Sequence, residues 1–80
     1  MSVRAWVLIQ AEPGRAGEVA LEARRVPGVV SCEVLVGPYD AVALVEMASL
    51  EDVGRTVVSS LQLIEGVTRT LTCPVVELAS

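Results

Sequence analysis

The stretch VPGVVSCEVLVGPYD, residues 26–40, decides the fold of this chain. Pro27 and Gly28 end a helical pattern, because proline lacks the N–H that a helix needs and glycine favours the turn that follows one. Residues 29–36 predict a half-buried β-strand, with Val30, Cys32, Val34 and Val36 alternating along its buried side. The GPYD motif at residues 37–40 then turns the chain back, which predicts a hairpin.

A second copy of the helix stop lies 38 residues further along, where IEGV at residues 64–67 matches VPGV at residues 26–29. Apolar residues recur every three or four positions before each stop, which predicts helices over residues 16–26 and 50–64. The expected buried stripe of the second helix is Leu50, Val53, Val57, Leu61 and Ile64. Ser49 is a suitable N-cap for the second helix. The remaining apolar and β-branched segments predict strands at residues 3–10, 41–47 and 68–76.

The predicted order is therefore βαββαβ in a single domain, residues 1–80. Each β-α-β crossover is right-handed, and two interleaved crossovers give a four-stranded antiparallel sheet in the order 4-1-3-2. Both helices then lie on one face of the sheet. The sequence predicts an α+β, ferredoxin-like sandwich.

Helices on one side leave the other face of the sheet uncovered. The predicted open face carries four apolar side chains from its two central strands: Trp6, Leu8, Val42 and Leu44. Hydrophobic residues make up 52% of the 80 residues, which is more apolar surface than so short a monomer easily hides. We expect a dimer that packs sheet against sheet, with Trp6 near its centre; the simpler alternative is a half-exposed tryptophan. Arg4 and Glu46 share this face and are expected to pair.

Composition excludes several classes of function. The net charge is −4, and the six basic residues are all arginines scattered among carboxylates, so direct nucleic-acid binding is not expected. Histidine and lysine are absent, which removes the usual bases, metal ligands and Schiff-base residues. We therefore predict no catalytic residue, no metal and no cofactor. With no spanning segment and no signal region, the expected location is the cytoplasm.

The two cysteines are expected to be inert. Cys32 and Cys73 fall on opposite edge strands of the predicted sheet, about 14 Å apart, which is too far for a disulfide. Both lie on apolar alternations, so buried thiols are predicted.

Candidate effector-binding residues gather in the hairpin and the last strand. The hairpin offers the only tyrosine of the chain beside a carboxylate, and its hydroxyl, carboxylate and free N–H groups suit a zwitterionic small molecule. The last strand adds threonine hydroxyls, although β-propensity alone also explains them, as a common turn explains the hairpin. The predicted set is Gly37, Pro38, Tyr39, Asp40, Thr68 and Thr70.

These motifs resemble the effector-binding (RAM) domain of the Lrp/AsnC transcription regulators over nearly the whole chain. The resemblance is carried by AWVLI at residues 5–9, Gly14, VPGV at residues 26–29, GPYD at residues 37–40 and GVTRT at residues 66–70. It implies dimers through the open sheet faces, rings of dimers, and amino-acid effectors bound where dimers meet, against the GPYD loop.

The regulators of that family also carry an N-terminal helix-turn-helix, whereas the first strand here begins at Val3. The chain is similar to a stand-alone form, which would sense an amino acid or co-assemble with a full-length regulator to modulate transcription. Two other interpretations stay open. One is a small dimeric α/β-barrel enzyme like the quinol monooxygenases, and the other is an oligomerisation domain without a ligand.

Overall fold

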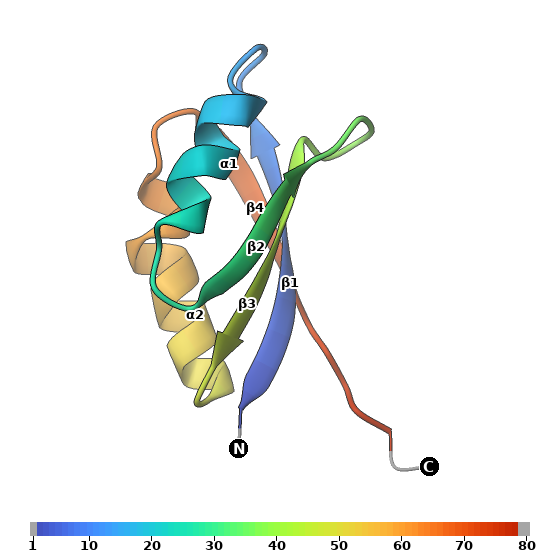
Figure 1. Ribbon diagram of the computed structural model, residues 1–80, viewed down its shortest axis with the longest axis vertical. Helices are drawn as coiled ribbons and strands as arrows, with labels where there is room; N and C mark the ends of the chain where they lie inside the picture. Colours follow the sequence, from blue (N-terminus) through green and yellow to red (C-terminus); the bar gives the residue numbers. More distant parts are fainter. Residues whose placement is uncertain (1, 79–80) are drawn as a thin grey trace.

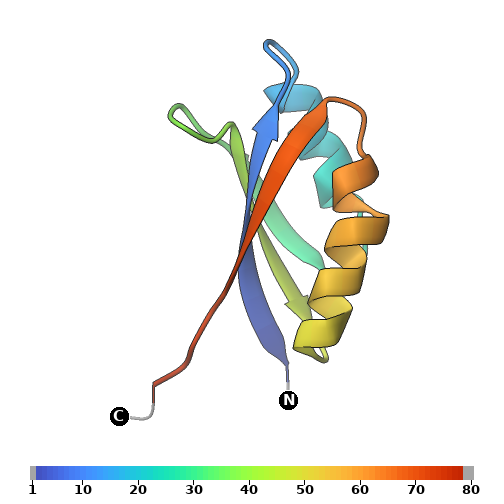
Figure 2. The ribbon, with the colours of Figure 1, turned by 180° about the vertical axis from the view of Figure 1, so that it is seen from behind.

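The computed structural model describes residues 2–78 as a two-layer α+β domain (Figure 1). Four antiparallel strands lie in the order β2-β3-β1-β4, which is the predicted order read from the other edge. Both helices cover one face of this sheet, and the other face is open (Figure 2). The ferredoxin-like fold is therefore confirmed. The elements are β1 (Val3–Ala11), α1 (Ala16–Arg24), β2 (Val29–Val34), β3 (Ala41–Met47), α2 (Leu50–Ser59), the 3-10 helix η1 (Leu61–Leu63) and β4 (Val67–Pro74).

The core lies between the sheet and the helices. Ala5, Val7 and Ile9 of β1 are fully buried, so the residues between them must face the open side of the sheet. The other elements contribute Val19, Ala20, Ala23, Cys32, Ala41, Ala43, Val45, Val53, Val57 and Leu61. Because one side of each central strand packs into this core, the alternate side chains of both strands must lie on the open face.

The two glycines of the repeat adopt the same backbone conformation. Gly28 has φ +95° and Gly66 has φ +100°, a region that side-chain-bearing residues rarely adopt. The carbonyl of Gly28 accepts a hydrogen bond from the N–H of Glu46, and that of Gly66 accepts one from the N–H of Glu12, both at 2.8 Å. Each glycine therefore ties the turn after a helical segment to a neighbouring strand.

Strand β2 differs from the prediction. It ends at Val34 instead of residue 36, and a register shift between residues 29 and 31 pairs Val29 with Val45. Only Cys32 of the predicted alternation is buried, whereas Val30, Val34 and Val36 are exposed. An irregularity of this kind inserts a residue, which turns Val30 outward while Val29 and Cys32 pack against the core; Val36 lies beyond the end of the strand. The prediction of a buried valine stripe on this edge strand was wrong.

Both helices are shorter than predicted. Ser49 caps α2 as expected, since its Oγ accepts a hydrogen bond from the N–H of Asp52 at 3.1 Å. The helix ends at Ser59, and Leu61 reaches the core from η1 instead. Leu50 was predicted to be buried but is exposed. Helix α1 likewise ends at Arg24 instead of residue 26.

The two cysteines lie on the two edge strands and are both free, which confirms that they form no internal disulfide. Cys32 is fully buried, and burial raises the pKa of its thiol. Cys73, however, is only half-buried and pairs in register with Trp6, so it belongs to the open face of the sheet. The expectation of two buried thiols holds for Cys32 alone.

Within residues 2–78, no helix has the length and apolar character needed to cross a membrane.

Candidate functional site

A backbone hydrogen bond connects the GPYD hairpin to the end of β1. The N–H of Asp40 donates to the carbonyl of Ile9 at 2.8 Å, and the carbonyl of Asp40 accepts from the N–H of Leu35 at 2.8 Å. Asp40 is thus bonded both to β1 and to the opposite arm of its own hairpin. The loop is therefore held at one end of the sheet.

Side chains add two further bonds between the hairpin and β1. Oδ2 of Asp40 accepts a hydrogen bond from the N–H of Ala11 at 2.7 Å, and Nε2 of Gln10 donates to the carbonyl of Pro38 at 3.0 Å. Tyr39 is half-buried between these anchored neighbours, whereas Gly37 and Pro38 are exposed. The carboxylate of Asp40 therefore has a structural role, since it holds the hairpin against β1. The sequence did not predict that Gln10 would bond to the hairpin.

The predicted threonines lie on the other side of β1, at the start of β4. Thr68 is exposed, and Thr70 is half-buried where its Oγ1 accepts a hydrogen bond from Nε2 of Gln62 at 3.0 Å. A cavity of about 400 Å³ opens here, lined by Gln62, Val67, Thr68, Arg69 and Thr70. Two of the predicted effector residues therefore line a cavity of ligand size.

The hairpin and the threonine cavity share one end of the sheet. The hairpin follows β2, and residues at the start of β4 line the cavity. The hairpin and the start of β4 lie on either side of the end of β1 (Figure 2). Adjacent strands are about 4.8 Å apart, so the two groups are separated by about two strand spacings. The structure thus brings the six predicted residues to one end of the sheet, in two clusters on either side of β1.

A second cavity, of about 610 Å³, lies on the helical side of the domain. Its lining comes from α1 and from the segment after α2: Arg15, Glu18, Leu21, Glu22, Arg25, Ser60, Leu63, Ile64 and Glu65. The sequence did not predict it, because charges on one side of a helical pattern are typical of a solvated face, and no local pattern places Glu65 beside them.

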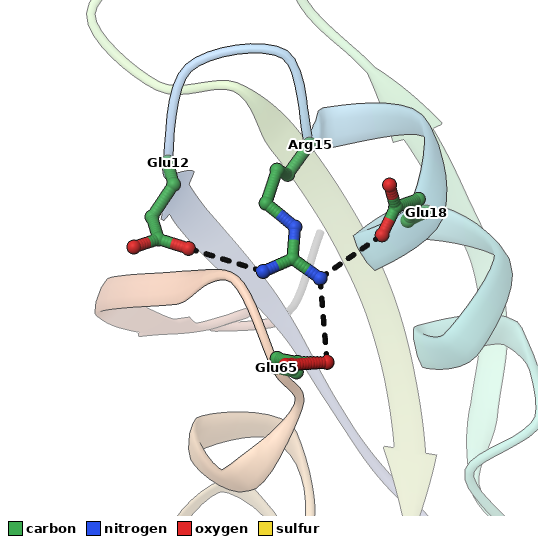
Figure 3. Close-up of polar contacts among 4 residues, drawn as sticks. All are labelled: Glu12, Arg15, Glu18 and Glu65. Carbon is green, nitrogen blue, oxygen red and sulfur yellow. Dashed lines mark hydrogen bonds and ion pairs between the residues drawn. The ribbon is translucent and has the colours of Figure 1, made fainter.

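Arg15 is the centre of the charges around this second cavity (Figure 3). Its guanidinium contacts the carboxylates of Glu12 at 3.2 Å, Glu18 at 3.0 Å and Glu65 at 3.4 Å. The hydrogen bond to Glu18, followed by that to Glu12, raises the pKa of Arg15. The cluster joins the turn after β1 to the segment before β4, and its carboxylates outnumber its one arginine.

The open sheet face is apolar, as predicted. Trp6 is 44% exposed and lies beside Leu44, while Leu8 lies beside Val42. Two residues of β4 that the sequence did not assign to this face extend it: Leu71, opposite Leu8, and Cys73, opposite Trp6.

The charged residues at the edge of this face pair differently from the expectation. Arg4 and Glu46 are register partners, but the guanidinium of Arg4 contacts the carboxylate of Glu77 at 3.5 Å. Glu46 instead accepts a hydrogen bond from Oγ of Ser2 at 3.1 Å. The expected Arg4–Glu46 ion pair is absent from the described residues, because the extended segment after β4 brings a competing carboxylate to Arg4.

Across residues 2–78, no three His, Cys, Asp or Glu side chains gather closely enough to hold a metal ion. What the fold presents is a ligand-sized cavity, an anchored loop and an uncovered apolar sheet face. The chain is therefore a small ferredoxin-like domain that carries these three features.

The chain belongs to the family described as the Lrp/AsnC ligand binding domain, whose model matches residues 4–79. Over 75 residues it is 33% identical to an uncharacterised HTH-type transcriptional regulator of Pyrococcus furiosus. That match covers 90% of this chain and 50% of the regulator. The chain therefore spans about half the length of the curated relatives it matches.

Solved structures agree on the fold. The crystal structure of TTHA0845 from Thermus thermophilus is 29% identical, with a TM-score of 0.89 over 98% of both chains. The transcriptional regulator NMB0573 of Neisseria meningitidis, solved as a complex with L-Met, is 22% identical with a TM-score of 0.81. That likeness covers 94% of this chain and 50% of the regulator.

Proposed function

We propose that this domain is a regulatory module that binds an amino acid at the end of its sheet, between the GPYD hairpin and the threonine cavity. The observation that carries the proposal is the position of the two predicted clusters on either side of the β1 end, one of them lining a cavity of about 400 Å³. Membership of a ligand-binding family supports it, as does the L-Met complex of the regulator from Neisseria meningitidis.

The proposed contacts divide by chemistry. The Tyr39 hydroxyl and the N–H groups of Gly37 and Tyr39 offer donors and an acceptor for a zwitterion. The hydroxyls of Thr68 and Thr70 offer more from β4. The carboxylate of Asp40 keeps the loop in place through Ala11. In this proposal Tyr39 contacts the ligand, and Asp40 holds the loop that presents it.

A thermal-shift screen against the twenty L-amino acids tests the binding proposal. Ligand at 100 times its dissociation constant stabilises the native state by about 2.7 kcal/mol. Each kcal/mol raises the Tm of a domain of this size by roughly 4–8 °C, so a binder gives a large shift. Tyr39→Phe should reduce that shift, and Ser59→Ala on the exposed side of α2 should leave it unchanged. No shift with any amino acid would favour an oligomerisation domain without a ligand.

We propose further that a second copy covers the open sheet face. Trp6 and Leu71, which are 44% and 43% exposed, lie on the face with Leu8, Val42 and Leu44, and contiguous apolar surface of this kind marks an interface. Trp6→Arg should lower the sedimentation coefficient to that of a monomer, and Val58→Arg on α2 should not. An unchanged profile for Trp6→Arg would place the interface elsewhere.

The thiol of Cys73 gives a second measurement on the same face. In the proposed dimer it is covered, so a thiol reagent should label it slowly in the wild-type protein and rapidly in Trp6→Arg. Cys32, which is fully buried in the core, should stay unlabelled in both. Rapid labelling of Cys73 in the wild-type protein would argue against this interface.

The effect on transcription would come through a partner. The matched relatives are HTH-type regulators of about twice the matched length, and this chain corresponds to one half of them. We propose co-assembly with full-length Lrp/AsnC regulators through the same domain surfaces. Native mass spectrometry of the chain mixed with such a regulator should show mixed assemblies, and only separate homo-oligomers would exclude this mode of action.

A further inference from the structure

The arginines of this acidic protein differ in whether they have a partner. Five of the six make an ion pair or a side-chain hydrogen bond: Arg4, Arg15, Arg24, Arg25 and Arg55. Within residues 2–78, Arg69 makes neither. In a chain of net charge −4, an arginine without a protein carboxylate is a cation available to a ligand.

Arg69 lines the threonine cavity, and its neighbours there are neutral. The lining holds the hydroxyls of Thr68 and Thr70 and the amide of Gln62, and it includes no carboxylate. Gln62 donates to Oγ1 of Thr70, which leaves the proton of that hydroxyl free to donate in turn. The cavity therefore combines one positive charge with several uncharged donors.

The larger cavity has the opposite character. Glu18, Glu22 and Glu65 line it, and both of its arginines, Arg15 and Arg25, are already paired with carboxylates. An anionic ligand would be repelled there and attracted at the smaller cavity. Charge therefore distinguishes the two cavities, although the acidic one is larger.

Gln10 connects Arg69 to the hairpin. It is the register partner of Arg69 across β1 and β4, and its Nε2 donates to the carbonyl of Pro38 at 3.0 Å. A row of residues thus crosses the end of the sheet from the hairpin through Gln10 to Arg69. Gln10 and Arg69 continue the alternation of Trp6 and Leu8, so this row lies on the open face of the sheet, and Arg69 is its member that also lines the cavity at the edge strand β4.

We propose that Arg69 binds the carboxylate of the ligand in this cavity, with the hydroxyls of Thr68 and Thr70 as further donors. This assignment rests on the proposed function and adds the orientation of the ligand, with its carboxylate at β4 and its other end toward the Tyr39 hairpin. A guanidinium suits the role because its planar donors match the two oxygens of a carboxylate. The cavity of about 400 Å³ lies within the range of small-molecule sites.

Calorimetric titration of Arg69→Gln tests the assignment. The probes are the twenty L-amino acids and, for each that binds, the matching amino-acid amide, which lacks the carboxylate charge. Arg69→Gln should weaken binding of the amino acid by about 10- to 100-fold, because a charge-assisted contact is lost. It should leave the weaker binding of the amide unchanged. Equal affinity of the amino acid for Arg69→Gln and the wild-type protein would overturn the assignment.

Arg55→Gln is the matched control, since Arg55 is an exposed arginine that pairs only with carboxylates of its own helix. It should bind the amino acid as the wild-type protein does. Equal Tm values for both variants without ligand would show that neither substitution disturbs the fold.

A second measurement separates this assignment from the proposed function. Titration with sodium acetate, followed by NMR at the backbone amides of residues 68–70, should shift those signals in the wild-type protein and not in Arg69→Gln. Acetate shifts without binding of any amino acid would retain the carboxylate site and reject the amino-acid function. Amino-acid binding with no acetate shift and no effect of Arg69→Gln would reject only the assignment of Arg69, and no response to either probe would reject both.

Discussion

Replacing Asp40 with alanine tests whether the hairpin is held in place by its own carboxylate. Oδ2 of Asp40 accepts a hydrogen bond from the N–H of Ala11 at 2.7 Å, and the residue is half-buried. A hydrogen bond to a charged group contributes about 1.5–3 kcal/mol, and partial exposure to water favours the lower value. Asp40→Ala should therefore lower the free energy of unfolding by about 1.5 kcal/mol. For a domain of this size that corresponds to a fall in Tm of roughly 6–12 °C.

Thermal denaturation followed by circular dichroism measures this effect. Protein concentration must be the same for every variant, because the Tm of an oligomer depends on it. Asp40→Asn keeps an oxygen acceptor without the charge, so it should lose less stability than Asp40→Ala. Glu33→Ala, at an exposed carboxylate on β2, should change the free energy of unfolding by less than about 0.5 kcal/mol. If Asp40→Ala has the same Tm as Glu33→Ala, the carboxylate of Asp40 does not hold the hairpin in place.

Three further substitutions test the core, a turn and a buried thiol. Leu61→Ala should lower the free energy of unfolding, measured by urea denaturation, by about 2–5 kcal/mol, because it leaves a cavity at a fully buried site. A loss below about 1 kcal/mol would show that Leu61 is not packed in the core. Gly28→Ala should cost more than about 1 kcal/mol, since φ is +95° and the new Cβ meets the Met47 side chain, whereas Gly37→Ala, with open space, should be close to neutral. Burial raises the pKa of Cys32, so above pH 9 the unfolded thiol ionises while the folded one stays protonated. The free energy of unfolding should therefore fall as the pH rises above 9. If the free energy of unfolding of Cys32→Ala falls equally steeply, ionisation of Cys32 is not the cause.

Local patterns in the sequence were enough to predict the element order. The proline and glycine at residues 27 and 28, the glycine at residue 66 and the GPYD hairpin mark where the chain turns, because these residue types act on their own backbone. Alternation along β1 was equally informative. Ala5, Val7 and Ile9 are fully buried, and Trp6 and Leu8 lie on the open face as expected.

The edge strands were harder to predict. A register shift in β2 exposes Val30, and another, between Gln10 and Ala11 where β1 meets β4, accompanies the start of the threonine strand. Such shifts depend on how a strand pairs with its neighbour, which no local pattern records. The same limit explains why Cys73 was expected in the core but lies beside Trp6.

The candidate site shows the same division. The sequence pointed to residues 37–40 because the turn holds the only tyrosine of the chain beside a carboxylate, and to two threonines because their hydroxyls recur along one strand. It did not point to Gln10, Gln62 or Arg69. These residues gain significance only from what lies next to them, and for Arg69 also from the lack of a partner within residues 2–78.

The sequence by itself therefore determined the βαββαβ order, the apolar open face and the loop that carries Tyr39. These properties follow from backbone preferences and from the period of apolar residues, both of which act over a few positions. Only the tertiary structure decided that Asp40 holds its loop through Ala11, and that Gln10 links that loop to the strand carrying Arg69. Those contacts join residues about thirty to sixty positions apart, and their partners are selected by strand register and chain geometry rather than by local sequence.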